Sequence, residues 1–113
     1  MDCIFCKIAN KEIATELVFE NEYVAAFKDM APQAPVHILA VPKIHISSMN
    51  EINKDNSHII AQIFEAINKI AETQGIMDSG YRVISNCGED GRQSVHHLHF
   101  HILGGKKLPD KLT

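Results

Sequence analysis

The chain has 113 residues, of which 45% are hydrophobic, and this is enough for one domain, residues 1–113, with a buried core. The formal net charge of −3 argues against non-specific binding to nucleic acid or to an anionic membrane. Because no apolar run has membrane-spanning length and no secretion signal begins the chain, we expect a cytoplasmic protein whose three cysteines form no disulfide framework.

The N-terminal half is expected to hold a short helix and three strands. The helix covers residues 2–11, and Asp2 is placed to cap it. Strand-like sequences follow at three places, bounded by turn residues and finally by Pro42: residues 17–19, 23–27 and 36–41. Residues 29–35, between the second and third strands, form a loop that contains two prolines.

The C-terminal half is expected to hold one long helix and two strands. The helix covers residues 56–74, and Gly75 is suited to end it. Its apolar side chains form one stripe at helical spacing, which we expect in the core or in a dimer interface: Ile59, Ile60, Ile63, Phe64, Ile67, Ile70 and Ala71. Strands are expected over residues 81–85 and 96–103, with a polar turn between them. Antiparallel strands with a helix inserted midway predict an α+β fold.

The last strand carries the most informative pattern in the chain. His97, His99 and His101 occur at every second position, and side chains alternate between the two faces of a strand. The three imidazoles are therefore expected on one face. The apolar residues between them are expected on the other face, together with His96. Three titratable rings are costly to group, so this pattern indicates a functional site.

Phosphoryl chemistry is the reaction that these residues suit best. His99 is the candidate nucleophile, because a neutral imidazole can attack phosphorus and form a covalent phosphoramidate. His101, when protonated, can hydrogen-bond a phosphate oxygen, and His97 or a backbone carbonyl can fix the tautomer of His99. Ser94 can donate a proton to a leaving group, and Arg92 can add a cation. Three histidines could instead hold a catalytic metal ion.

A pair of cysteines near the N-terminus predicts a second cluster. Cys3 and Cys6 are one helical turn apart, which suits half of a zinc site or a redox pair. The redox pair would need a preceding βαβ unit, so we favour zinc, with His45 as the third ligand and His97 or His96 as the fourth. The alternative is two buried, reduced thiols.

Three other side chains have plainer expectations. Cys87 lies in the polar turn and is expected to be a bystander thiol. His58 is expected to be solvated on the long helix. His37 is expected to satisfy a hydrogen bond in the core rather than to bind a ligand.

Residues 97–103 resemble the histidine triad family, because they match in full its alternation of three histidines with apolar residues. Other segments resemble the nucleotide-binding branch of this family in order and spacing: residues 5–8, 26–35, 41–46 and 93–95. The similarity covers about the whole chain. It implies a five-stranded antiparallel sheet with one short N-terminal helix and one long helix, and a homodimer with the long helix at the interface.

The resemblance also implies a nucleoside monophosphate ligand. Asp29 would accept hydrogen bonds from the ribose hydroxyls, with Met30 beside it, and His99 would form a nucleotidyl-histidine supported by His97. The phosphate or leaving group would contact three further residues: His101, Asn86 and Ser94. An apolar pocket would hold the base, and its members would be Phe5, Ile8, Phe19, Phe27 and Leu39. In related transferases with a Cys-x-x-Cys zinc site, the fourth ligand lies two residues before the nucleophile.

The function implied is hydrolysis of purine nucleoside phosphoramidates such as adenosine 5′-monophosphoramidate. We expect no cofactor in catalysis, and we expect a structural zinc ion. We expect no nucleic-acid or membrane partner. The third histidine supports hydrolysis, because the related transferases have glutamine there. The alternatives are hydrolysis of dinucleoside polyphosphates or nucleotidyl sulfates, and a non-catalytic nucleotide sensor or scaffold. Arg92 stands where the branch commonly has glycine, and the C-terminal segment lacks the tryptophan that the branch often has.

Overall fold

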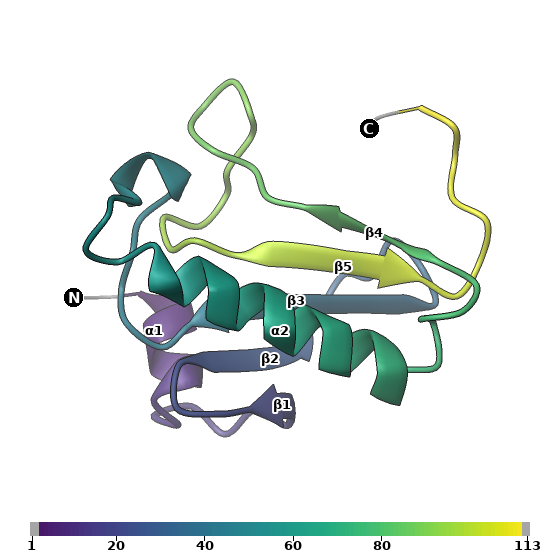
Figure 1. The fold of residues 1–113 in the computed structure, drawn as a ribbon, viewed down its shortest axis with the longest axis horizontal. Coiled ribbons are helices and arrows are strands. Elements are labelled where there is room, and N and C mark those ends of the chain that lie inside the picture. Colours follow the sequence, from purple (N-terminus) through teal and green to yellow (C-terminus); the bar gives the residue numbers. More distant parts are fainter. Residues whose placement is uncertain (1–2, 112–113) are drawn as a thin grey trace.

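A computed structural model describes residues 3–111 of the chain. In chain order its elements are α1 (Ile4–Ala9), β1 (Leu17–Glu20), β2 (Val24–Lys28), β3 (Val36–Pro42), the 3₁₀ turn η1 (Met49–Glu51), α2 (His58–Thr73), β4 (Tyr81–Ile84) and β5 (Phe100–Gly104). The predicted α+β fold, a five-stranded antiparallel sheet with one short and one long helix, is confirmed (Figure 1). Within residues 3–111, no helix combines the length and apolarity needed to span a membrane.

The strand order β1-β2-β3-β5-β4 places β3 and β5 side by side in the middle of the sheet. In their register Leu39 pairs with His101, and His37 pairs with Leu103. Directly opposed residues share a face of an antiparallel pair, and so do residues two apart on one strand. His37, Leu39 and His101 therefore lie on the same face of the sheet.

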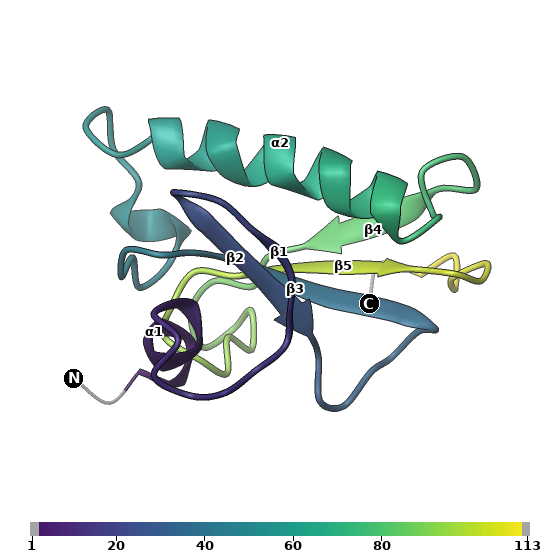
Figure 2. The same ribbon diagram turned by 90° about the horizontal axis from the view of Figure 1, so that it is seen from below.

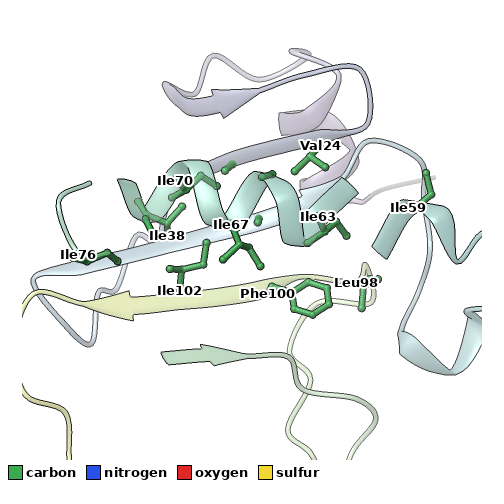
Figure 3. Close-up of a cluster of buried hydrophobic side chains, with 14 of the residues drawn as sticks. Val24, Ile38, Ile59, Ile63, Ile67, Ile70, Ile76, Leu98, Phe100 and Ile102 are labelled. Carbon is green, nitrogen blue, oxygen red and sulfur yellow. The ribbon is translucent and has the colours of Figure 1, made fainter. Parts of the chain in front are cut away.

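The two helices cover opposite faces of the sheet, as Figure 2 shows. Side chains of α2 and of the sheet form the larger core cluster, in which Ile67 and Ile70 lie close to Ile38 and Ile102 (Figure 3). Full burial of each large aliphatic side chain stabilises the fold by about 1.5–3 kcal/mol. The predicted stripe of α2 is buried as expected, except that Ile60 is half-buried and Phe64 is 55% exposed.

The alternation along the histidine segment holds, although β5 is shorter than predicted and begins only at Phe100. Leu98 belongs to the α2-side core, whereas His97 and His99 are buried among residues on the α1 side. The backbone N–H of Leu98 donates to the carbonyl of Ile46 at 2.6 Å, which holds the extended segment before β5 in place. The prediction that His96 joins the apolar face is wrong, because the chain bends there and leaves His96 exposed.

The N-terminal helix is also shorter than predicted. It begins at Ile4, and its N-cap is Cys3, whose Sγ accepts a hydrogen bond from the backbone N–H of Cys6 at 3.3 Å. The predicted cap Asp2 lies outside the described residues. The Cys3 sulfur thus accepts a hydrogen bond from one of the backbone N–H groups that have no partner within the first turn of the helix. The start of α1 therefore depends on one of the two cysteines predicted to bind zinc.

Candidate active site

The proton positions in His99 follow from a backbone carbonyl. Nδ1 of His99 lies 2.7 Å from the carbonyl oxygen of His97, and a carbonyl oxygen can only accept. Neutral His99 therefore carries its proton on Nδ1, and the lone pair on Nε2 is free to act as a nucleophile. The Ser85 hydroxyl donates to the carbonyl of His99 at 2.8 Å, and the edge of Phe5 packs against the His99 ring with centroids 5.0 Å apart.

A second chain of hydrogen bonds orients His101. The backbone N–H of Gln33 donates to Nδ1 of His37 at 3.0 Å, so the proton of neutral His37 is on Nε2. That Nε2 lies 2.9 Å from Nδ1 of His101, which must therefore accept. The remaining proton of neutral His101 is consequently on Nε2, where the ring can donate to a ligand.

Burial, reinforced by repulsion from His99 and His37, lowers the pKa of His101 to about 4. The ring is therefore uncharged at neutral pH when no ligand is bound. The sequence predicts that His101 donates after protonation. The hydrogen bond from His37 instead lets the neutral His101 ring donate through Nε2.

His37 satisfies a core hydrogen bond, as predicted, but it also contacts the triad, which sequence reasoning missed. The signal lies in strand pairing: His37 is two residues from Leu39, which is paired with His101. A single sequence without the β3–β5 register does not reveal this proximity.

Asp29 follows β2 and lies beside these rings. Its Oδ1 accepts from the backbone N–H of Ala31 at 2.8 Å, and its Oδ2 is 3.5 Å from Nε2 of His37. The carboxylate is thus fixed beside His37, where it can accept further hydrogen bonds. Met30, the next residue, is fully exposed.

The apolar cluster on the α1 side contains most of the predicted base pocket. Phe5, Ile8, Phe27 and Leu39 belong to it, and the rings of Phe5 and Phe27 meet edge to face with centroids 5.4 Å apart. Sequence reasoning missed three partly buried members, because no local pattern marks them: Ile13, Leu17 and Val95.

The prediction that Phe19 lines this pocket is wrong. The pairing of β1 with β2 shifts between Leu17 and Phe19, so Leu17 pairs with Phe27 but Phe19 pairs with Ala26. Ala26 faces α2, and Phe19 packs against the same α2-side cluster. A register irregularity of this kind moves a side chain to the opposite face.

The polar turn before the histidine segment is held by Gln93. Its Nε2 donates to the carbonyls of Ser47 at 2.7 Å and Val95 at 3.0 Å, while its Oε1 accepts from the backbone N–H of Gly88 at 3.0 Å. Sequence reasoning had assigned no role to Gln93. Two predicted ligand contacts lie in this region, with Ser94 exposed and Asn86 half-buried.

Arg92 also lies in this turn and is exposed. Its backbone has φ of 61°, the left-handed conformation that glycine adopts without strain and that other residues rarely adopt. The structure therefore explains why glycine would suit this position.

Four side chains expected to bind zinc come together at one end of the triad, with which they share His97: Cys3, Cys6, His45 and His97. Their potential ligand atoms all lie within 4.8 Å of one another. Both thiol sulfurs are 3.3 Å from Nδ1 of His97, and Sγ of Cys6 is 3.2 Å from Nδ1 of His45. The exposed His96 is not part of this group.

The protonation of His97 fits a metal ligand. Its Nε2 lies 2.9 Å from the carbonyl oxygen of Pro42, so Nε2 carries the proton and the lone pair on Nδ1 faces the two sulfurs. Burial lowers the pKa of this ring, which keeps it neutral. Burial and the neighbouring Cys3 thiol raise the pKa of Cys6 to about 11, a cost that a divalent cation between the sulfurs would remove. The donor set of two thiolates and two imidazoles suits tetrahedral zinc.

A second group of potential ligands, Asp29, His37 and His101, also lies within 4.8 Å. The hydrogen bond from the Gln33 N–H needs the lone pair on Nδ1 of His37. A metal ion on Nε2 would then leave this imidazole without a proton. The second group is therefore better suited to orienting His101 than to holding a metal ion.

Comparisons with known proteins agree with this geometry. The family model described as "Scavenger mRNA decapping enzyme C-term binding" matches residues 2–111. The structure of a histidine triad protein from Clostridium difficile superimposes with a TM-score of 0.95 at 54% identity, covering 98% of this chain and 96% of that chain. This chain belongs to the histidine triad family.

Two further proteins are closely similar to this chain. A HIT family hydrolase from Clostridium thermocellum superimposes with a TM-score of 0.95 at 46% identity, covering 99% of this chain and 97% of that chain. The purine nucleoside phosphoramidase of Escherichia coli (strain K12) is 40% identical over 112 residues, which cover 99% of this chain and 94% of that protein. The histidine triad assignment thus rests on both sequence and structure over almost the whole chain.

Proposed function

We propose that this histidine triad protein hydrolyses purine nucleoside phosphoramidates, such as adenosine 5′-monophosphoramidate, through a nucleotidyl-histidine intermediate. The observation that carries the proposal is the hydrogen bond from Nδ1 of His99 to the His97 carbonyl, which leaves Nε2 of His99 nucleophilic. The similarity to the phosphoramidase of Escherichia coli supports the same reaction.

In the first step, Nε2 of His99 attacks phosphorus and the phosphorus–nitrogen bond breaks. The His97 carbonyl stabilises the positive charge that develops on the His99 ring, and the Nε2–H of His101 donates to a phosphate oxygen. We assign the proton that the departing amine takes up to the exposed Ser94 hydroxyl. In the second step, water attacks phosphorus, the bond between phosphorus and His99 breaks, and the proton that water loses returns to Ser94, which releases the nucleotide and restores His99.

The nucleotide would lie across the α1 side of the sheet. The Asp29 carboxylate would accept from the ribose hydroxyls, with Met30 at the rim, and Asn86 would contact the phosphate or leaving group. The base would lie against the apolar cluster, in the pocket formed by Phe5, Ile8, Phe27 and Leu39. Phe19 has no part in this pocket, because it packs on the other face of the sheet.

We assign a structural zinc to Cys3, Cys6, His45 and His97, and no cofactor to catalysis. When bound, zinc would hold α1 against the segments that carry His45 and His97. A catalytic metal on the triad receives less support, because Nδ1 of His97 faces the thiols whereas Nδ1 of His101 faces His37. Among residues 3–111, the three imidazoles of the triad do not form a group whose ligand atoms all lie within 4.8 Å of one another.

A homodimer is proposed from the exposed aromatic surface where α2 meets β4. Phe64 is 55% exposed, and Tyr81 and Val83 beside it are each 37% exposed. An exposed apolar patch of this kind is typical of a contact surface. A cytoplasmic location without nucleic-acid or membrane partners remains the expectation from composition.

The test compares turnover of adenosine 5′-monophosphoramidate by the wild type and by His99→Ala, with His96→Ala as the control at an exposed neighbouring histidine. Loss of turnover in His99→Ala alone supports the proposal, and equal rates in all three proteins contradict it. Faster cleavage of a dinucleoside polyphosphate by the wild type would favour the alternative substrate class. Nucleotide binding without turnover would favour a sensor or scaffold.

A further inference from the structure

The cysteine pair lies on either side of a residue of the proposed nucleotide pocket. Phe5 is between Cys3 and Cys6 in the chain, and its ring packs against three groups of the site. Ring centroids are 5.4 Å apart for Phe5 and Phe27, 5.0 Å for Phe5 and His99, and 6.1 Å for Phe5 and His97. The position of Phe5 is therefore coupled to both cysteines.

The helix that carries Phe5 is too short to be stable by itself. α1 has six residues, whereas isolated helices shorter than about 12–15 residues are marginal in water. Its start is fixed by Cys3, which caps it, and by the contacts of both sulfurs with Nδ1 of His97. The first turn of α1 is thus held on the sheet by the sulfur contacts as well as by the buried side chains of the helix.

The two sulfurs are placed to react with one another. Cys3 and Cys6 are one helical turn apart, which corresponds to a Cα–Cα separation of about 5 Å and falls within the range that a disulfide spans. Both sulfurs lie within hydrogen-bonding distance of the same nitrogen, 3.3 Å in each case. Cys6 is half-buried, so an oxidant can reach it, whereas Cys3 is 8% exposed.

We propose that Cys3 and Cys6 form a reversible disulfide that releases the metal ion and weakens nucleotide binding. In the zinc-loaded protein both sulfurs are thiolates, the form that reacts with peroxide. With hydrogen peroxide as the oxidant, the Cys6 thiolate attacks one peroxide oxygen, the oxygen–oxygen bond breaks, and a sulfenic acid and a hydroxide form. The Cys3 thiolate then attacks that sulfur, which forms the disulfide and releases a second hydroxide. The peroxide gains two electrons and the two thiolates lose them.

Two consequences follow from the loss of the thiolates. A disulfide is a poor zinc ligand because zinc binds thiolates, so only the two histidines of the cluster remain. Cys3 and Cys6 can no longer hold Nδ1 of His97, and Phe5 loses its fixed position against His99. This inference rests on the proposed nucleotide pocket and metal centre, but it concerns their control by oxidation.

The test uses the full chain refolded with one equivalent of zinc, with and without hydrogen peroxide. We expect a disulfide between Cys3 and Cys6 in peptide mass spectrometry and release of zinc to a chromogenic chelator. We also expect the dissociation constant for AMP to rise at least tenfold, and a dithiol with added zinc to restore it. Cys87→Ser should respond like the wild type, and Cys6→Ser should form no intramolecular disulfide.

The inference is overturned if the disulfide forms while zinc stays bound or AMP affinity is unchanged, or if peroxide modifies Cys87 alone. The reduced protein serves as the separate test of function. If it fails to bind AMP or to turn over a phosphoramidate, the proposed function fails, whereas disulfide formation and zinc release in the same sample would still establish the redox site.

Discussion

His97 serves two clusters through two different atoms. Its carbonyl oxygen lies 2.7 Å from Nδ1 of His99, while its own Nδ1 lies 3.3 Å from the sulfur of Cys3. The backbone of this residue therefore fixes the tautomer of the nucleophile, and its side chain belongs to the metal cluster. The two roles predicted for His97 do not compete, because they use separate groups.

Replacing His37 should impair catalysis more than binding. His37→Ala removes the donor that keeps the proton of His101 on Nε2, so we expect kcat to fall by about 10- to 100-fold, in line with other orienting partners. The affinity for AMP should change little. Nitrogen-15 NMR of the imidazoles provides an independent readout, because the His101 proton should redistribute to Nδ1. Unchanged kcat with an unchanged His101 tautomer would refute this role.

Mutations at two phenylalanines should separate the faces of the sheet. Phe27→Leu should weaken AMP binding several-fold, because Phe27 belongs to the cluster on the α1 side. Phe19→Leu should leave AMP affinity unchanged, because that ring packs on the α2 side. Isothermal titration calorimetry measures both. If Phe19→Leu lost as much AMP affinity as Phe27→Leu, Phe19 would belong to the nucleotide pocket, which would contradict the observed register.

The fold and the location of both clusters were predictable from the sequence because their signals are local. The alternation in residues 97–103 and the spacing of Cys3 and Cys6 can be read directly from neighbouring positions. The helical stripe of α2 is equally local, and it predicts the buried face correctly except at the half-buried Ile60 and the exposed Phe64.

The errors arose where long-range geometry decides the outcome. Phe19 lies on the α2 side of the sheet because the β1–β2 register shifts, and no residue type at that position indicates the shift. The contact between His37 and His101 joins residues 64 positions apart, so it depends on strand pairing. His96 leaves the expected alternation because the chain bends before β5 begins.

Removal of metal should destabilise the protein. A ligand that binds only the folded state stabilises it by about 4 kcal/mol when present at a thousand times its dissociation constant. A strong chelator should therefore lower the melting temperature of the zinc-loaded protein, and His45→Ala should reproduce this effect without chelator. His96→Ala should melt like the wild type. Thermal melts that do not respond to chelator or to His45→Ala would contradict a structural role for zinc.

The exposed aromatic surface should control assembly. Phe64→Glu places a charge on the patch formed with Tyr81 and Val83, so we expect the dimer to dissociate into monomers. Sedimentation equilibrium measures the change, and Lys54→Glu, at an exposed position outside the patch, is the matched control. A wild type that sediments as a monomer would contradict the proposed dimer.

Glu20 should contribute to stability only above acidic pH. Hydrogen bonds from Lys43 at 2.7 Å and from Lys11 at 2.9 Å hold the pKa of this carboxyl below its usual value of 4.5. Ionised Glu20 therefore favours the folded state above about pH 4.5, and this contribution is lost as the pH falls through the lower folded-state pKa. Urea unfolding should show Glu20→Gln slightly less stable than the wild type at pH 7, with the difference vanishing at low pH. A constant difference at all pH values would rule out this ion pair as its source.

The most direct test of the account is to trap the covalent intermediate. The enzyme is mixed with adenosine 5′-monophosphoramidate, quenched during turnover and analysed by peptide mass spectrometry under conditions that preserve phosphorus–nitrogen bonds. We predict an adenylyl group on His99 that disappears when turnover is complete and is absent from His99→Ala. An unmodified His99 throughout turnover, together with full activity of His99→Ala, would contradict the mechanism.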